Sequence, residues 1–192
     1  MVRGIWSKGT GAGAHHEIRA AVACGALVAV MLSVLVAPVA PAAAQVRGSG
    51  WELPLALANE AALEAVRACA EKGWPVSVAV VDVSGETRVL VKSDHSTTHT
   101  RTSSFRKAYT VATLGPVFGF DTLSAFVEKT RGGPSTQALA SLPEILLLAG
   151  GVGVKAKGEI VAAIGVGGAP GGEKDEACAA AGLARIADRL PH

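Results

Sequence analysis

The spacing of apolar side chains changes several times after residue 52, and each change predicts a new element. Helical spacing over residues 55–72 predicts a helix whose buried stripe is Leu55, Ala58, Ala62, Val66 and Cys69. An apolar run over 76–82 predicts a buried strand, and alternation over 87–92 predicts a second strand with Thr87, Val89 and Val91 on one face. The Ser84-Gly85 turn between the two strands makes them a hairpin.

Two further helices, a second hairpin and a last helix are predicted in the rest of the chain. A helix is predicted over 103–114, ended by Gly115-Pro116, and a short helix capped by Asp121 runs through Lys129. A second hairpin turns at 155–158, and a last helix spans 173–190 with the stripe Ala179, Leu183, Ile186 and Leu190. Because hairpins pair antiparallel, the predicted fold class is α+β.

The first 44 residues have the layout of a secretory signal peptide. Arg3, Lys8 and Arg19 precede an uncharged run over residues 20–45 that is rich in Ala, Val and Leu and reaches Ala44 through prolines and alanines. We therefore expect cleavage after Ala44, a short tether over 45–52 and one domain over 53–192. The alternative is an uncleaved membrane anchor, because the run is long enough to span a bilayer.

Removing the signal peptide changes the charge of the chain. The whole sequence has 192 residues and a formal net charge of +2, but the part after Ala44 carries equal numbers of basic and acidic side chains. A nucleic-acid binder needs a basic field to neutralise phosphates, so we expect no nucleic-acid partner. Cys69 and Cys178 remain in this part, and outside the cytoplasm they could form a disulfide. Cys178 lies beside the stripe of its helix, which favours partly buried free thiols instead.

Three groups of motifs suggest a family. The first group is the apolar run over 75–82 followed by Ser84-Gly85, and the second is Arg-Lys-Ala-Tyr-Thr at 106–110. The third group is Gly-Gly-Val at 150–152 with residues 164–170 and Asp175-Glu176. This set resembles the hairpins, helix and acidic helix start of the GlcG/HbpS family of heme-binding proteins, which is related to the C-terminal domain of PduO-type proteins. The chain departs where relatives often have Met-Asp-Gly-Ala and it has Ser-Asp-His-Ser at 93–96, and where Gly153 replaces a common proline.

The resemblance implies a fold, partners and a function. It implies a profilin-like antiparallel sheet flanked by helices, assembly as a homo-oligomer, and, as in some secreted members, binding of heme or iron and communication with a membrane sensor kinase. We therefore expect an exported, periplasmic or extracellular heme-binding protein for heme capture, storage or sensing. The alternatives are a small enzyme acting on an organic acid or aldehyde, and a sensor-kinase accessory protein that needs no heme. The absence of a recognisable nucleophile motif favours a protein that is not an enzyme.

The first candidates for heme ligation are His95 and His99. Neutral imidazole is a good ligand for iron, and a four-residue spacing would place both rings on one face of a helix. The intervening Ser96, Thr97 and Thr98 favour a loop instead. The alternative to ligation is a pair of solvated loop histidines.

Further candidates follow in the predicted helix over 103–114. Arg106 or Lys107 could pair with a heme propionate, and the phenol of Tyr109 could ligate ferric iron or donate a hydrogen bond to a ligand. The alternatives are a surface lysine and a half-buried tyrosine.

A glycine-rich loop over 165–172 leads into the last helix and suggests a phosphate cradle. No Gly-Lys-Ser/Thr follows it, and the helix begins with Glu173, Asp175 and Glu176, whose charges would repel phosphate. Carboxylates suit hard or ferric cations, so these three residues are candidate metal ligands. The alternative is that they only stabilise the helix N-terminus.

Overall fold

The computed structural model describes residues 50–192, so the predicted signal peptide over 1–44 and most of the predicted tether lie outside the described residues. The described elements, in chain order, are α2 (Leu55–Ala70), β1 (Ser77–Asp82), β2 (Thr87–Lys92), α3 (Thr98–Phe118), α4 (Leu123–Thr130), α5 (Thr136–Ala140), β3 (Gly151–Ala156), β4 (Glu159–Gly167), α6 (Gly172–Ile186) and the 3-10 helix η1 (Ala187–Arg189). None of the helices in this part of the chain is both long and apolar enough to cross a membrane.

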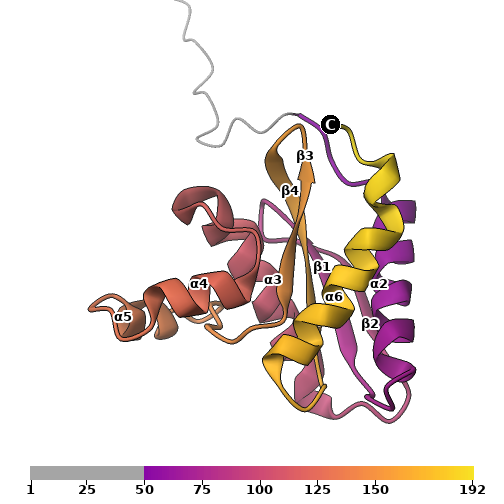
Figure 1. Ribbon diagram of the computed structural model, residues 1–192, viewed down its shortest axis with the longest axis horizontal. Coiled ribbons are helices and arrows are strands. Elements are labelled where there is room, and N and C mark those ends of the chain that lie inside the picture. Colours follow the sequence, from indigo (N-terminus) through magenta and orange to yellow (C-terminus); the bar gives the residue numbers. More distant parts are fainter. Residues whose placement is uncertain (1–49) are drawn as a thin grey trace, which may run out of the picture. The chain divides into compact units, whose positions relative to one another are not determined.

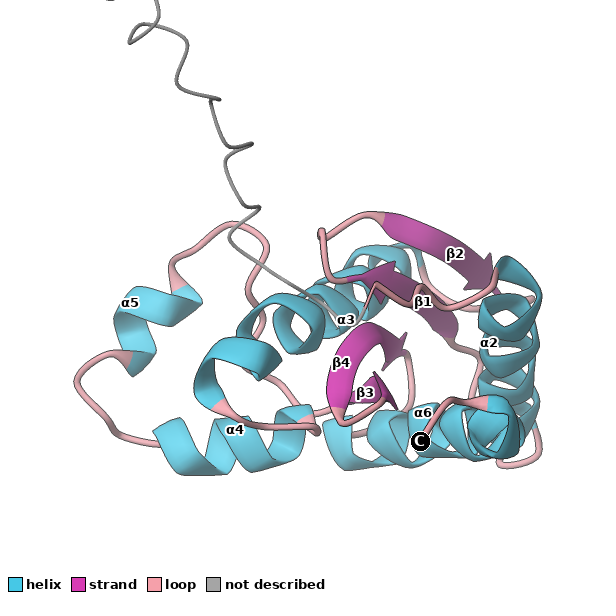
Figure 2. Cartoon of the chain, turned by 90° about the horizontal axis from the view of Figure 1, so that it is seen from above, coloured by secondary structure: helices cyan, strands magenta, loops and turns pink. Residues whose placement is uncertain are grey.

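The strands form one antiparallel sheet in the order β2-β1-β4-β3. The two predicted hairpins supply the outer pairs, and β1 and β4 join them at the centre, where Val78 lies opposite Val166. Helices cover both faces: α2 and α6 lie side by side on one face, and α3 crosses the other (Figure 1; Figure 2). The prediction of an α+β fold with a profilin-like antiparallel sheet flanked by helices is confirmed.

Alternation along β1 divides the core between these two layers. Val78 and Val80 face α2 and α6, whereas Ala79 and Val81 face α3. On β4, glycine takes the place of a side chain beneath α3: a Cβ atom on Gly165 would lie 2.2 Å from the carbonyl oxygen of Ser104. The glycines that suggested a phosphate loop therefore begin inside a strand, where they let a helix backbone approach the sheet.

A disulfide joins the two helices of the first layer. Cys69 of α2 and Cys178 of α6 are bonded, and both residues are buried. The expectation of two free thiols is therefore wrong. The apolar stripe of α6 did not predict the disulfide, because α6 packs against two partners, the sheet and α2. Cys178 lies on the side of α6 that faces α2. The prediction for Leu55 also fails, since this residue is 55 % exposed at the start of α2.

Helix α3 is longer than its sequence pattern predicts. It begins at Thr98, where Thr100 is buried and shares a 2.8 Å hydrogen bond with Ser77 of β1. It continues through Pro116 to Phe118, whose ring lies 5.4 Å from that of Phe126. Packing on the sheet and on α4 thus extends the helix beyond both predicted ends, and Gly119, in a left-handed conformation, ends it.

Candidate functional site

Both candidate histidines lie on the surface where β2 leads into α3. His95 occupies the turn before the helix with a φ of 63°, and His99 lies in the first helical turn rather than in a loop. The Nδ1 atom of His99 is 3.2 Å from the hydroxyl oxygen of Thr97. Because this contact engages Nδ1, the other ring nitrogen, Nε2, is left to face a ligand.

The conformation of His95 is unusual for its residue type. A left-handed φ places Cβ close to the following backbone and costs a non-glycine residue roughly 1–2 kcal/mol. Strained conformations of this kind are concentrated at functional sites. The position also falls within the segment where the sequence departs from the family pattern Met-Asp-Gly-Ala.

Arg106 and Tyr109 lie further along α3, and both are partly buried. Arg106 donates from Nη2 to the carbonyl oxygen of Ile145, and its buried Nε has no hydrogen-bond partner. The ring of Tyr109 lies 5.6 Å from that of Phe105, and a Cβ atom on Gly85 would come within 2.6 Å of it. Tyr109 therefore packs beside the β1–β2 turn, about 15 Å along the helix axis from His99.

Lys107 is neither a surface residue nor available to a heme propionate. Its side chain is 2 % exposed, and Nζ lies 2.7 Å from Oδ2 of Asp175 on α6. Asp175 also accepts a hydrogen bond from the backbone N–H of Ala169. Burial raises the pKa of the Asp175 carboxyl above its ordinary value, against the lowering effect of the Lys107 ammonium. The prediction for Lys107 is corrected, because a buried ion pair satisfies its charge.

Glu176 holds together three segments of the chain. Its Oε2 accepts hydrogen bonds of 3.0 Å from the backbone N–H groups of Ser124 and Gly150, and its Oε1 accepts from the Ser124 hydroxyl. Gly150 is needed at this point, because a Cβ atom there would lie 2.7 Å from Nζ of Lys107. The carboxylate of Glu176 therefore ties α6 to the start of α4 and to the loop before β3.

The acidic start of α6 does not bring its carboxylates together as a metal site. Asp175 pairs with Lys107, Glu176 binds backbone donors, and Glu173 is exposed on the surface. Across residues 50–192, no group of three or more His, Cys, Asp or Glu side chains is placed to hold a metal ion. The alternative of pure helix-end stabilisation is also incomplete, because two of these carboxylates have long-range structural partners.

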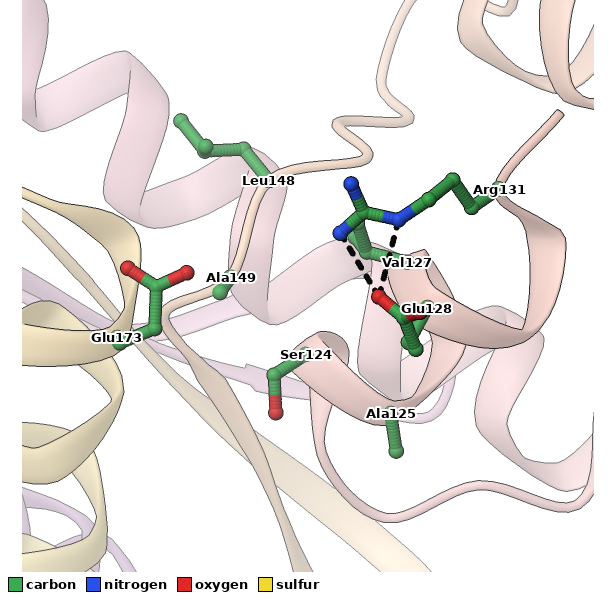
Figure 3. Close-up of a pocket in the computed structure, with 8 residues that line it drawn as sticks. All are labelled: Ser124, Ala125, Val127, Glu128, Arg131, Leu148, Ala149 and Glu173. Carbon is green, nitrogen blue, oxygen red and sulfur yellow. Dashed lines mark hydrogen bonds and ion pairs between the residues drawn. The ribbon is translucent and has the colours of Figure 1, made fainter.

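A pocket of about 540 Å³ lies beside Glu173, between α4 and the loop that precedes β3. It is lined by Ser124, Ala125, Val127, Glu128, Arg131, Leu148, Ala149 and Glu173. Figure 3 shows the Glu173 carboxylate on one side and the Glu128–Arg131 ion pair on the other, with Ala149 and Ser124 between them. Apart from Glu173, the sequence reasoning missed this pocket, because no local motif links α4 to residues 148–149.

Sequence comparison identifies the family of the chain. The family model described as "Haem degrading protein HbpS-like" matches residues 53–184. The chain belongs to this family. The resemblance to the GlcG/HbpS group is therefore confirmed over nearly all of the predicted domain. A search of curated proteins found no match.

Solved structures agree with the family assignment. A double mutant of HbpS from Streptomyces reticuli is 39% identical, with a TM-score of 0.63 over 77% of this chain and 95% of that chain. Two more distant structures show the same fold. The protein ORFY of Klebsiella pneumoniae is 21% identical (TM-score 0.65, 75% of this chain and 97% of that chain), and the PduOC–heme complex is 19% identical (TM-score 0.62, 71% and 96%).

Proposed function

We propose that this protein is an exported heme-binding protein that uses the segment around His95 and His99 to ligate the heme iron. Membership of a family described as HbpS-like heme-degrading proteins is the observation that carries the proposal. The contact between Thr97 and His99 supports it, because a hydroxyl group beside Nδ1 orients the ring and leaves Nε2 free for a metal.

Arg106 is the propionate partner in this proposal. It lies seven residues after His99, which is about two helical turns, or ~10 Å, along the same face of α3. Its unpaired Nε supports a role in holding a carboxylate. Lys107 is excluded from that role by its bond to Asp175. When bound, the heme would supply the iron chemistry, and these residues would supply the ligand and the counter-charge.

Hemin titration of the protein after Ala44 tests this proposal. The wild-type protein should give a saturable, shifted Soret band. The double variant His95→Ala with His99→Ala should bind at least tenfold more weakly, because loss of a ligand's outer-shell partner alone typically costs roughly 10–100-fold in metal affinity. His192→Ala is the matched control, since this terminal histidine lies beside residues of β3 and α6 and away from the first turn of α3. Equal binding by all three proteins would exclude His95 and His99 as ligands, and no binding by the wild type would refute heme binding.

We also propose that the protein works outside the cytoplasm. The basic start, the apolar run and the alanines before Gln45 support export, and a disulfide between Cys69 and Cys178 suits an oxidising compartment. Mass measurement on protein expressed from its full gene should give a chain that begins at Gln45 and changes mass on reduction. The variant Cys69→Ser should show no such change. An intact N-terminus with free thiols would contradict export.

Heme degradation is a second candidate function, favoured by the description of the matched family. Hydrogen peroxide added to the heme-loaded protein should then bleach the Soret band faster than it bleaches free hemin. Equal or slower loss would favour storage or sensing. An enzyme of organic acids or aldehydes remains an alternative that the hemin titration separates from both.

The proposal includes assembly as a homo-oligomer and contact with a membrane sensor kinase. The similarity to HbpS, at 39% identity, supports the assembly, because members of the family that the chain resembles commonly form homo-oligomers. Light scattering of the purified protein measures its oligomer size. Capture of a sensor kinase by the heme-free protein as well as by the heme-loaded protein would favour an accessory role without heme.

A further inference from the structure

The pocket beside Glu173 is open to solvent and has the size of a small-molecule site. Its volume of about 540 Å³ lies within the range of roughly 300–1,000 Å³ that is typical of small-molecule pockets. None of the residues proposed above to hold heme lines it. Any ligand of this pocket is therefore distinct from the heme proposed for α3.

The walls of the pocket are fixed in advance by Glu176. This side chain binds the backbone of Ser124, at the start of α4, and that of Gly150, next to the pocket residue Ala149. The two bonds hold α4 and the 148–149 segment at a set distance from α6. A ligand would therefore meet a formed pocket and would not have to order it, which reduces the free-energy cost of binding.

The floor and one edge of the pocket are apolar. Ala125, Val127, Leu148 and Ala149 contribute hydrocarbon surface, and Leu148 is 49 % exposed. Covering such surface is favourable in water. The ligand should accordingly carry an aliphatic chain or a similar apolar body.

The charged side chains of the pocket determine which charged group the ligand should carry. Arg131 lies 2.7 Å from Glu128, so this pair is close to neutral as a unit. Among residues 50–192, no side chain forms a hydrogen bond or ion pair with Glu173, so one negative charge in the pocket is not neutralised by another side chain. An anion would face this carboxylate and would compete with Glu128 for Arg131. A cation would meet a free partner.

We infer that this pocket binds a small aliphatic amine, with the alkyl chain on Leu148 and its apolar neighbours and the ammonium group at Glu173. The required ligand chemistry is a primary ammonium on a short hydrocarbon chain. Glu176 is engaged by backbone donors and does not line the pocket, and Glu128 is paired with Arg131, so Glu173 is the carboxylate that meets the ligand.

Hexylamine, hexanol and hexanoate are probes of equal chain length that separate charge from apolar contact. In an NMR titration of the full domain, hexylamine should shift the backbone amides of Ser124, Leu148 and Glu173 and bind more tightly than the other two probes. In Glu173→Gln the advantage of hexylamine over hexanol should fall by about two- to fivefold, as expected for a partly exposed ion pair. Glu86→Gln, in the exposed β1–β2 turn, should leave that advantage unchanged.

Three results would overturn the inference. The first is equal or tighter binding of hexanol or hexanoate to the wild-type protein, which would leave only a non-selective apolar contact. The second is an unchanged hexylamine preference in Glu173→Gln. The third is a set of amide shifts that lie outside the pocket. Heme binding is measured separately through the Soret band, so failure of either proposal is recognisable without the other.

Discussion

The first and third turns of α3 carry polar side chains in opposite environments. His99 is exposed, and Thr97, whose hydroxyl lies beside its Nδ1 atom, is a near neighbour in the chain. Lys107 is buried, and its partner Asp175 is separated from it by 68 residues. The difference comes from what packs above each side chain: His99 faces solvent, whereas α6 and the loop before β3 close over Lys107.

This contrast distinguishes polar side chains that can bind a ligand from those that are already paired within the protein. A residue whose charge is matched inside the protein stabilises the fold and has little left for a ligand. An exposed side chain oriented by a local bond retains a free atom. The following experiments test the contrast, beginning with its buried half.

The largest effect is expected from Asp175→Ala. This change leaves the Lys107 ammonium buried without its carboxylate, which typically costs about 3–5 kcal/mol of the free energy of unfolding. Urea unfolding measures this loss. The double variant Lys107→Met with Asp175→Leu removes both charges and should be closer to the wild type in stability.

An exposed pair supplies the matched comparison. Glu128→Ala breaks the ion pair with Arg131, in which both side chains are 71% exposed, and should cost less than about 1 kcal/mol. Similar losses in Asp175→Ala and Glu128→Ala would remove the distinction between the buried and the exposed regions.

A smaller loss is expected from Glu176→Ala. The backbone N–H groups of Ser124 and Gly150 would lose their acceptor, at a cost of about 1–3 kcal/mol. The amide resonances of both residues should shift. Glu173→Ala, in the same turn of α6 but exposed, should change stability by no more than about 0.5 kcal/mol. Equal effects at the two positions would argue against the bridging role of Glu176.

The pH dependence of stability shows whether burial or the charge of Lys107 has the larger effect on the pKa of Asp175. Burial raises the pKa of Asp175 in the folded protein, so the folded state holds this proton more tightly than the unfolded chain does. The resulting stabilisation is fully present below the unfolded pKa of about 3.9 and is lost as the pH rises through the folded value.

The wild type and Asp175→Asn should be compared by urea unfolding between about pH 3 and pH 7. The stability of the wild type relative to the variant should fall as the pH rises. An increase with pH would mean that the attraction of Lys107 outweighs burial and holds the pKa of Asp175 below its ordinary value.

The smallest effect concerns the exposed region. His95→Gly relieves a left-handed conformation and should raise the free energy of unfolding by up to about 1 kcal/mol, because the greater freedom of glycine in the unfolded chain offsets part of the gain. It should also weaken hemin binding if His95 is the ligand.

Lys157→Gly is a matched control for His95→Gly, because Lys157 also has a positive φ, of 53°, in the β3–β4 turn. It should give a similar stability change with unaltered hemin binding. Equal hemin affinities in the two glycine variants would move the ligand role from His95 to His99.

Much of the fold follows from local pattern. The strand over Thr87–Lys92 was predicted at its observed bounds, because alternation and a flanking turn define it within a few residues. Both ends of α3 were missed, since the buried contact between Thr100 and Ser77 and the packing of Phe118 on Phe126 come from distant segments. The cap of α4 is Thr122 rather than Asp121, which pairs with Lys155.

Some features of the candidate site also follow from the local sequence, whereas others depend on contacts between distant segments. The exposure of His95 and the half-buried state of Tyr109 agree with what their local sequence suggests. The burial of Lys107, the bonds of Glu176 and the pocket beside Glu173 depend on α6 and α4 meeting the loop before β3. No spacing within one segment carries that information, and the covalent pairing of Cys69 with Cys178 was missed for the same reason.

The disulfide between α2 and α6 also makes most of the domain a covalent ring. Its two cysteines are 109 residues apart in the chain, and the sheet, α3, α4 and the exposed α5 all lie between them. A protease that cuts the chain once near α5 would open this ring without releasing a fragment. Both pieces would remain one molecule until a reductant separated them.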